Sequence, residues 1–132
     1  MSAAVFMAAH KNRSFPARLG FAWQGLRHAL RSEASLRLQA ACLVVAVGAL
    51  TVLRPHALWW ALVLLASATV LAAELLNSAI EALADELHPH DSPGVRRAKD
   101  YAAAGVLLAA LGALAVAVAL AVQLLRGAAP AG

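Results

Sequence analysis

The sequence predicts an all-α integral membrane protein in which an N-terminal amphipathic surface helix precedes three transmembrane helices. Apolar residues make up 62% of the 132 residues, whereas about 45–50% is usual in a soluble domain. Three apolar runs are separated by short segments that contain proline, histidine and charged residues. Each run can be extended to the length of a membrane-spanning helix, and a chain of this size is expected to form one domain.

The basic residues gather on one side of the predicted membrane topology. Six of the eleven Lys and Arg residues precede Gln39, and Arg96, Arg97 and Lys99 precede the last apolar run. The positive-inside rule therefore places the N-terminus and the loop before the third span in the cytoplasm, and the C-terminus outside. The net charge of +4 does not indicate a nucleic-acid partner, because these cations flank membrane spans.

Residues 15–33 are expected to form an amphipathic helix that lies in the membrane interface. Their apolar side chains recur at three- and four-residue spacing, and the arginines lie on other faces. The charges prevent this segment from spanning the membrane, and Trp23 would lie at headgroup depth. A soluble amphipathic helix that packs on the bundle is the alternative interpretation.

The three membrane helices are expected over residues of about 36–53, 57–87 and 95–125. Pro55 interrupts the helix between the first two spans. Trp59 and Trp60 follow directly, as expected of residues that anchor a helix at the membrane interface. Two prolines and two histidines predict a loop over residues 88–94. The topology then brings the end of the second span close to the beginnings of the first and third.

A polar stripe occupies the cytoplasmic end of the second membrane helix. At about 100° per residue, five polar side chains fall on one face of this helix. They are Glu74, Asn77, Ser78, Glu81 and Asp85. Carboxylates in or beside a membrane are costly and therefore indicate a functional site. The topology brings Glu33 and Lys99 to the same side of the membrane.

Carboxylates beside basic residues at a membrane surface permit more than one function. Mg²⁺ binds through one or two carboxylates plus substrate phosphates, and a partly desolvated carboxylate can act as a general base. The set therefore fits phosphoryl transfer to a lipid hydroxyl. It also fits a cation or proton pathway, or a structural cluster that joins helices, and the residue pattern gives the three interpretations comparable weight.

The polar stripe resembles the signature of the small prokaryotic diacylglycerol kinase family, E-x-x-N-[ST]-[AS]-[IL]-E-x-x-x-D. Residues 74–85 match it at every fixed position. Two further blocks agree with the family, and they are Gly25-Leu26-Arg27 leading to Glu33-Ala34-Ser35-Leu36-Arg37, and Arg97-Ala98-Lys99-Asp100. The three blocks lie in the family's order and spacing, so the resemblance covers about residues 15–125.

The resemblance implies a fold, an activity and a location. Members of this family are small integral membrane kinases with one surface helix and three membrane helices in each protomer, and they assemble as homotrimers with shared sites. They transfer the γ-phosphoryl group of MgATP to a lipid hydroxyl at the cytoplasmic face of the bacterial inner membrane. The chain is thus expected to be one such domain over residues 1–132, with ATP, Mg²⁺ and a membrane lipid as ligands.

The resemblance also implies roles for individual residues. Glu74 is expected to be the general base on the lipid hydroxyl, with Asn77 and Asp85 in the same catalytic network. Glu33 and Glu81 are expected to hold Mg²⁺ and, with it, the ATP phosphates. Further nucleotide contacts are expected from Phe21, His90, Asp91, Lys99 and Asp100. Further lipid contacts are expected from Trp23, Arg27, Ser35 and Arg37.

The chain departs from the family pattern in two places. Members often carry a leader arginine and an aromatic hydroxyl near the nucleotide, where this chain offers Arg13 or Arg18, and Phe21. The loop after Asp85 differs from that of enterobacterial members. The block that begins at Glu33 favours diacylglycerol as the acceptor, and the proline-bearing loop favours undecaprenol. Diacylglycerol is the expected acceptor, undecaprenol is the alternative, and a non-enzymatic ion-conducting or structural assembly is the alternative of another class.

Overall fold

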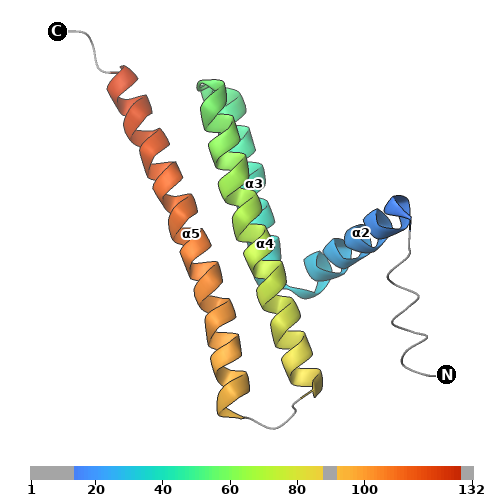
Figure 1. Ribbon diagram of the computed structural model, residues 1–132. Helices are drawn as coiled ribbons and strands as arrows, with labels where there is room; N and C mark the ends of the chain where they lie inside the picture. The colour runs from blue at the N-terminus through green and yellow to red at the C-terminus, as the bar shows by residue number, and fades with distance from the viewer. Residues whose placement is uncertain (1–13, 88–91, 129–132) are drawn as a thin grey trace. The chain divides into compact units, whose positions relative to one another are not determined.

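The computed structural model describes residues 14–87 and 92–128 of the chain. Within these ranges the chain forms four helices and no strand, namely α2 (Phe15–Ser32), α3 (Ala34–Leu53), α4 (Ala57–Leu87) and α5 (Pro93–Ala128), as Figure 1 shows. This confirms the predicted all-helical fold. The helices α3, α4 and α5 are each long and apolar enough to cross a membrane, as expected. The chain divides into two units after Ser32, and each unit is described by itself.

The first unit contributes α2. The helix begins after Ser14, whose carbonyl accepts a hydrogen bond from the Arg18 N–H at 3.2 Å. It ends at Ser32, whose hydroxyl donates to the His28 carbonyl at 3.2 Å. Its large apolar side chains are mostly exposed, with Trp23 at 65%. A location in the membrane interface would cover these side chains, and that location stays a prediction.

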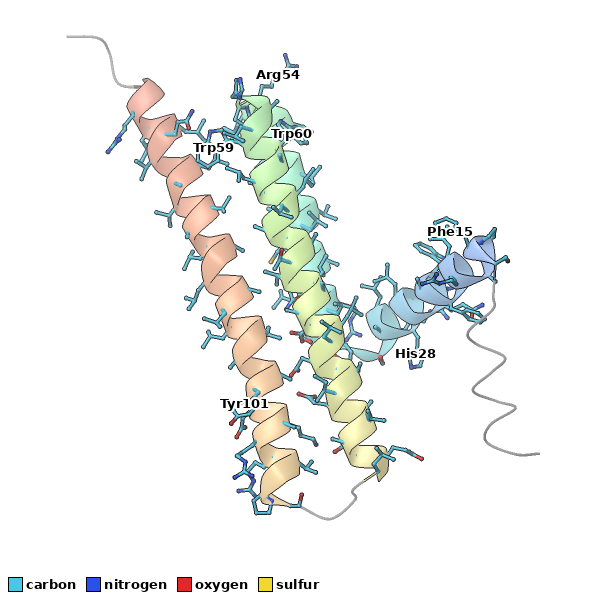
Figure 2. All side chains as sticks on the ribbon, viewed as in Figure 1. Phe15, His28, Arg54, Trp59, Trp60 and Tyr101 are labelled. Carbon is cyan, nitrogen blue, oxygen red and sulfur yellow. The ribbon has the colours of Figure 1, made fainter. Side chains whose placement is uncertain are left out.

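A three-residue turn joins α3 to α4 in the second unit. Arg54 has the left-handed backbone conformation (φ 47°, ψ 49°), and its N–H donates to the Leu50 carbonyl at 3.0 Å. This bond satisfies a carbonyl at the end of α3, as left-handed C-terminal residues commonly do. Pro55 then prevents the helix from continuing. Trp59 and Trp60 lie near Arg54 at this end of the unit (Figure 2).

The strained backbone of Arg54 leads to a prediction about stability. A left-handed conformation costs a residue with a Cβ atom about 1–2 kcal/mol, whereas glycine adopts it readily. We expect Arg54→Gly to raise the free energy of unfolding by about 0.5–1 kcal/mol, since the unfolded chain also gains some freedom. The measurement is the thermal unfolding midpoint in detergent micelles. Arg54→Ala keeps the Cβ atom and should give no gain, and an equal gain from alanine would contradict this explanation.

The second unit contains the three helices that can span a membrane and is called the membrane unit. It is held together by α4, which contacts both α3 and α5. The less exposed positions of α5 recur every three or four residues, and they are Val95, Lys99, Ala102, Val106, Ala109, Ala113, Val116, Leu120 and Leu124. Such a period forms a continuous seam along a neighbouring helix, and its alanines permit close packing. In Figure 1, α5 runs beside α4 over most of their length.

The helix α5 begins two residues earlier than the sequence predicts. The sequence predicts a start near Val95, because Pro93 and Gly94 are typical of a loop. Instead, Pro93 begins the helix, where its missing N–H needs no partner. The Ser92 hydroxyl accepts a hydrogen bond from the Val95 N–H at 3.3 Å and caps this turn.

The helices α4 and α5 are longer than a membrane is thick. With 31 and 36 residues, they measure about 46 and 54 Å at 1.5 Å per residue. The hydrocarbon core of a bilayer is about 30 Å thick, which about 20 helical residues span. If α4 enters the hydrocarbon core at Ala57, its first residue, about 20 residues bring it to the other boundary near Leu76. The last three turns of α4 then project from the membrane, and they carry most of the polar stripe.

Candidate functional site

The polar stripe of α4 lies at the end of the membrane unit where α3 and α5 begin (Figure 1). The helix α3 runs away from this end, α4 returns to it, and α5 starts from it. Tyr101, near the start of α5, lies toward this end in Figure 2, opposite Trp59 and Trp60. This order brings side chains of α3, α4 and α5 to one region. They form three successive levels along α4, from the most buried to the most exposed.

The innermost level contains Glu74. Its side chain is 7% exposed, and no other polar or charged residue in the described ranges is buried. The Gln39 Nε2 atom of α3 donates a hydrogen bond to Glu74 Oε2 at 3.3 Å. A buried carboxylate needs such a partner because it has lost its hydration. A buried carboxylate in a membrane-spanning helix is costly, and such a residue indicates a functional site.

The next level contains Asn77 and Glu81. The Asn77 Nδ2 atom donates to Glu81 Oε1 at 2.9 Å, which fits two residues one turn apart on a helix. The Asn77 Oδ1 atom is buried, and no hydrogen-bond partner for it lies within the described residues. Ser78 is half-buried beside it, whereas Glu81 is exposed. A ligand that arrives from water can therefore reach the Glu81 carboxylate.

The outermost level is an ion pair between α5 and α4. The Lys99 ammonium contacts Asp85 Oδ1, and the two side chains are 33% and 70% exposed. An ion pair this accessible contributes at most about 1 kcal/mol to stability. Asp100 is the next residue of α5 and is exposed. A phosphate could replace Asp85 as the partner of Lys99 at little cost.

Glu33 stands at the N-terminal boundary of α3. It occupies the capping position with an extended backbone, and its side chain makes no capping hydrogen bond. Its carboxylate is thus not used by the helix. In the described part of the chain, no group of three or more His, Cys, Asp or Glu side chains could hold a metal ion. Two carboxylates do suit Mg²⁺ when substrate phosphates supply further oxygen ligands. The roles of Glu33 and Glu81 as ligands of a cation stay predictions.

The remaining predicted site residues in the described ranges lie on α2 and α3. Predicted contacts in the described ranges are Phe21, Trp23 and Arg27 on α2, and Ser35 and Arg37 on α3, all of them exposed. Arg13, His90 and Asp91 lie outside the described residues. Because α2 belongs to the other unit, its contacts with the site stay predictions.

Gln39 is the site residue that the sequence pattern did not identify. It lies in the second turn of α3, just before a long apolar run. An amide in a membrane helix needs a hydrogen-bond partner. This requirement could have indicated from the sequence that Gln39 contacts a polar residue of another helix. The identity of that partner depends on how α3 packs on α4, and spacing along one helix does not reveal it.

Known proteins resemble the chain over most of its length. The family described as "Prokaryotic diacylglycerol kinase" matches residues 20–121. The diacylglycerol kinase of Escherichia coli (strain K12) is 37% identical over 92 residues, which cover 68% of this chain and 74% of that protein. The diacylglycerol kinase of Synechocystis sp. is 33% identical over 97 residues, or 73% of this chain and 55% of that protein. The family match contains all three levels of the site.

Proposed function

Because the chain belongs to the prokaryotic diacylglycerol kinase family and is thereby a lipid kinase, we propose that it phosphorylates diacylglycerol. The donor is MgATP and the product is phosphatidic acid. The observation that carries the proposal is the buried Glu74, which is 7% exposed and lies where α4 leaves the predicted hydrocarbon layer. A lipid headgroup arrives at this depth, so the carboxylate stands beside its hydroxyl.

Glu74 acts as the general base in this proposal. It takes the proton of the lipid hydroxyl while the hydroxyl oxygen attacks the γ-phosphorus. A new oxygen–phosphorus bond forms, and the bond from the γ-phosphorus to the β–γ bridging oxygen breaks, so its electron pair leaves with ADP. Burial of Glu74 keeps water, a competing acceptor, away from the base.

The outer levels of the stripe bind the nucleotide. Glu33 and Glu81 hold Mg²⁺ together with the ATP phosphates, and Asn77 orients Glu81 through its hydrogen bond. The cation supplies charge neutralisation at the transferring phosphoryl group. Lys99 adds a further positive charge, which Asp85 holds in place before the nucleotide binds. Seven residues separate Glu74 from Glu81, or about 10 Å along the helix, which a triphosphate chain can bridge.

The location and assembly follow from charge and family. The chain is a bacterial membrane protein, as its three spans and its relatives indicate. We place the site on the cytoplasmic side, because Arg96, Arg97 and Lys99 flank it and cytoplasmic flanks are rich in such residues. We propose a homotrimer with shared sites, as the resemblance implies. Many large apolar side chains of α3, α4 and α5 are exposed and are available to lipid or to other protomers.

The test of the proposed function is phosphate transfer from ATP in mixed micelles, with diacylglycerol and undecaprenol in parallel. We expect a higher kcat/KM for diacylglycerol. Preferential phosphorylation of undecaprenol would replace the acceptor but keep the kinase. Phosphate on neither lipid would overturn the proposal, and ion flux into proteoliposomes without ATP would then favour the non-enzymatic alternative.

The metal role of Glu81 can be tested separately. We expect Glu81→Ala to raise the Mg²⁺ concentration needed for half-maximal activity by about tenfold or more, the usual order for weakened metal binding. The matched control is Glu86→Ala, because Glu86 is exposed on the same helix and outside the polar stripe. An unchanged Mg²⁺ requirement in Glu81→Ala would count against this role.

A further inference from the structure

We propose that Gln39 is a positioning residue for the base and that its amide can bond Glu74 both before and after proton transfer. The inference rests on the proposed function, because it concerns the same reaction. Three observations carry it. Gln39 donates to Glu74 across the α3–α4 interface at 3.3 Å, the accepting carboxylate is 7% exposed, and the Gln39 Oε1 atom is buried with no hydrogen-bond partner in the described residues.

The first part of the inference concerns the carboxylate before the reaction. An ionised carboxylate can only accept hydrogen bonds, so a partner in this position must donate. The Gln39 Nε2 atom donates without bringing a charge. A cation in its place would stabilise the ionised form and make the carboxylate a weaker base. A neutral amide therefore fixes the direction of Glu74 and stabilises its ionised form less than a cation would.

The second part concerns the carboxyl group after it has taken the proton. A protonated carboxyl group becomes a donor, and the Nε2 group can no longer satisfy it at the protonated oxygen. A half-turn of the amide about its last bond presents Oε1, an acceptor, instead. In the described part of the structure this Oε1 atom is buried and has no hydrogen-bond partner. One amide can thus serve both states of the base, and a leucine of similar size can serve neither.

A second membrane glutamine offers a matched control. The Gln123 Oε1 atom of α5 accepts a hydrogen bond from the Trp59 indole N–H of α4 at 2.6 Å. This bond also joins two membrane helices, but it lies at the end of the unit away from the polar stripe. Replacing either glutamine by leucine removes one bond between helices. Only the change at Gln39 alters the surroundings of Glu74.

The experiment measures kcat and KM for ATP with diacylglycerol in mixed micelles, alongside the thermal unfolding midpoint. We expect Gln39→Leu to lower kcat by about 10- to 100-fold, the usual effect of a misplaced catalytic group, while KM for ATP stays within about twofold. Gln123→Leu should lower the midpoint and leave kcat within about twofold of wild type. Gln39→Glu should recover part of the lost kcat, because two close carboxyl groups share one proton and one of them can then donate.

The results of this experiment distinguish a positioning role of Gln39 from a purely structural role, and both from a failure of the proposed kinase function. Equal losses of kcat in Gln39→Leu and Gln123→Leu would show that the effect is structural and would overturn the inference. A wild-type kcat in Gln39→Leu would do the same. If Gln39→Leu does not fold, a folded Gln39→Glu with wild-type KM for ATP and no kcat would also overturn it. A wild-type protein that phosphorylates no lipid would instead refute the proposed function.

Discussion

Glu74→Gln is expected to lower kcat by about 10²–10⁴-fold, the range that general-base catalysis usually provides. An amide has nearly the size of the carboxylate but cannot take the hydroxyl proton. Its oxygen can still accept the hydrogen bond from Gln39, which the carboxylate accepts at 3.3 Å in the wild-type protein. The contact between α3 and α4 should therefore survive, and the loss should appear in kcat and not in folding.

The measurement for this variant is turnover with saturating MgATP and diacylglycerol, together with elution in detergent as a check of assembly. Glu86→Gln is the control, because it makes the same chemical change at an exposed position of α4. We expect that control to have wild-type kcat. Near wild-type turnover in Glu74→Gln would show that another group takes the proton.

Lys99→Met is expected to lower kcat by about 10²–10³-fold, as happens when one group that stabilises the transition state is removed. The ion pair with Asp85 joins α5 to α4, so the substitution also removes a contact between helices. This exposed contact contributes at most about 1 kcal/mol, which cannot account for so large a loss. The charge on the transferring phosphoryl group can account for it.

Asp85→Asn separates the two explanations for Lys99. It breaks the ion pair but keeps the ammonium group for the nucleotide. We therefore expect a smaller loss of kcat in Asp85→Asn than in Lys99→Met, and partial activity in Lys99→Arg, which keeps the charge. Equal losses in Lys99→Met and Asp85→Asn would indicate that the pair itself matters, and that Lys99 has no direct role at the phosphates.

The helices of the membrane unit could be predicted closely from local signals. The second span was expected over about 57–87, and α4 occupies Ala57–Leu87, because a proline turn and two tryptophans mark its start. The spacing of the polar stripe also placed its five side chains on one face of that helix. These features depend on residues that are close in sequence, so the periodicity of a single helix is enough to find them.

Features that depend on packing between helices could not be predicted in this way. The sequence placed Lys99 and Asp85 on the same side of the membrane, but their ion pair depends on the register of α5 against α4. The bonds of Gln39 with Glu74 and of Trp59 with Gln123 depend likewise on which faces meet. The trimer, the metal ligands and the contacts from α2 involve further molecules or the other unit, and they remain proposals.

The most direct test of the central claim is transfer of labelled γ-phosphate from ATP to diacylglycerol by the purified wild-type protein. The assay uses detergent micelles that contain diacylglycerol as the sole acceptor, with and without a chelator of divalent cations. We predict labelled phosphatidic acid that forms at a rate proportional to enzyme and disappears when the cation is removed. Labelled phosphatidic acid that fails to form in the presence of MgATP, under conditions where the protein is folded, would contradict the account.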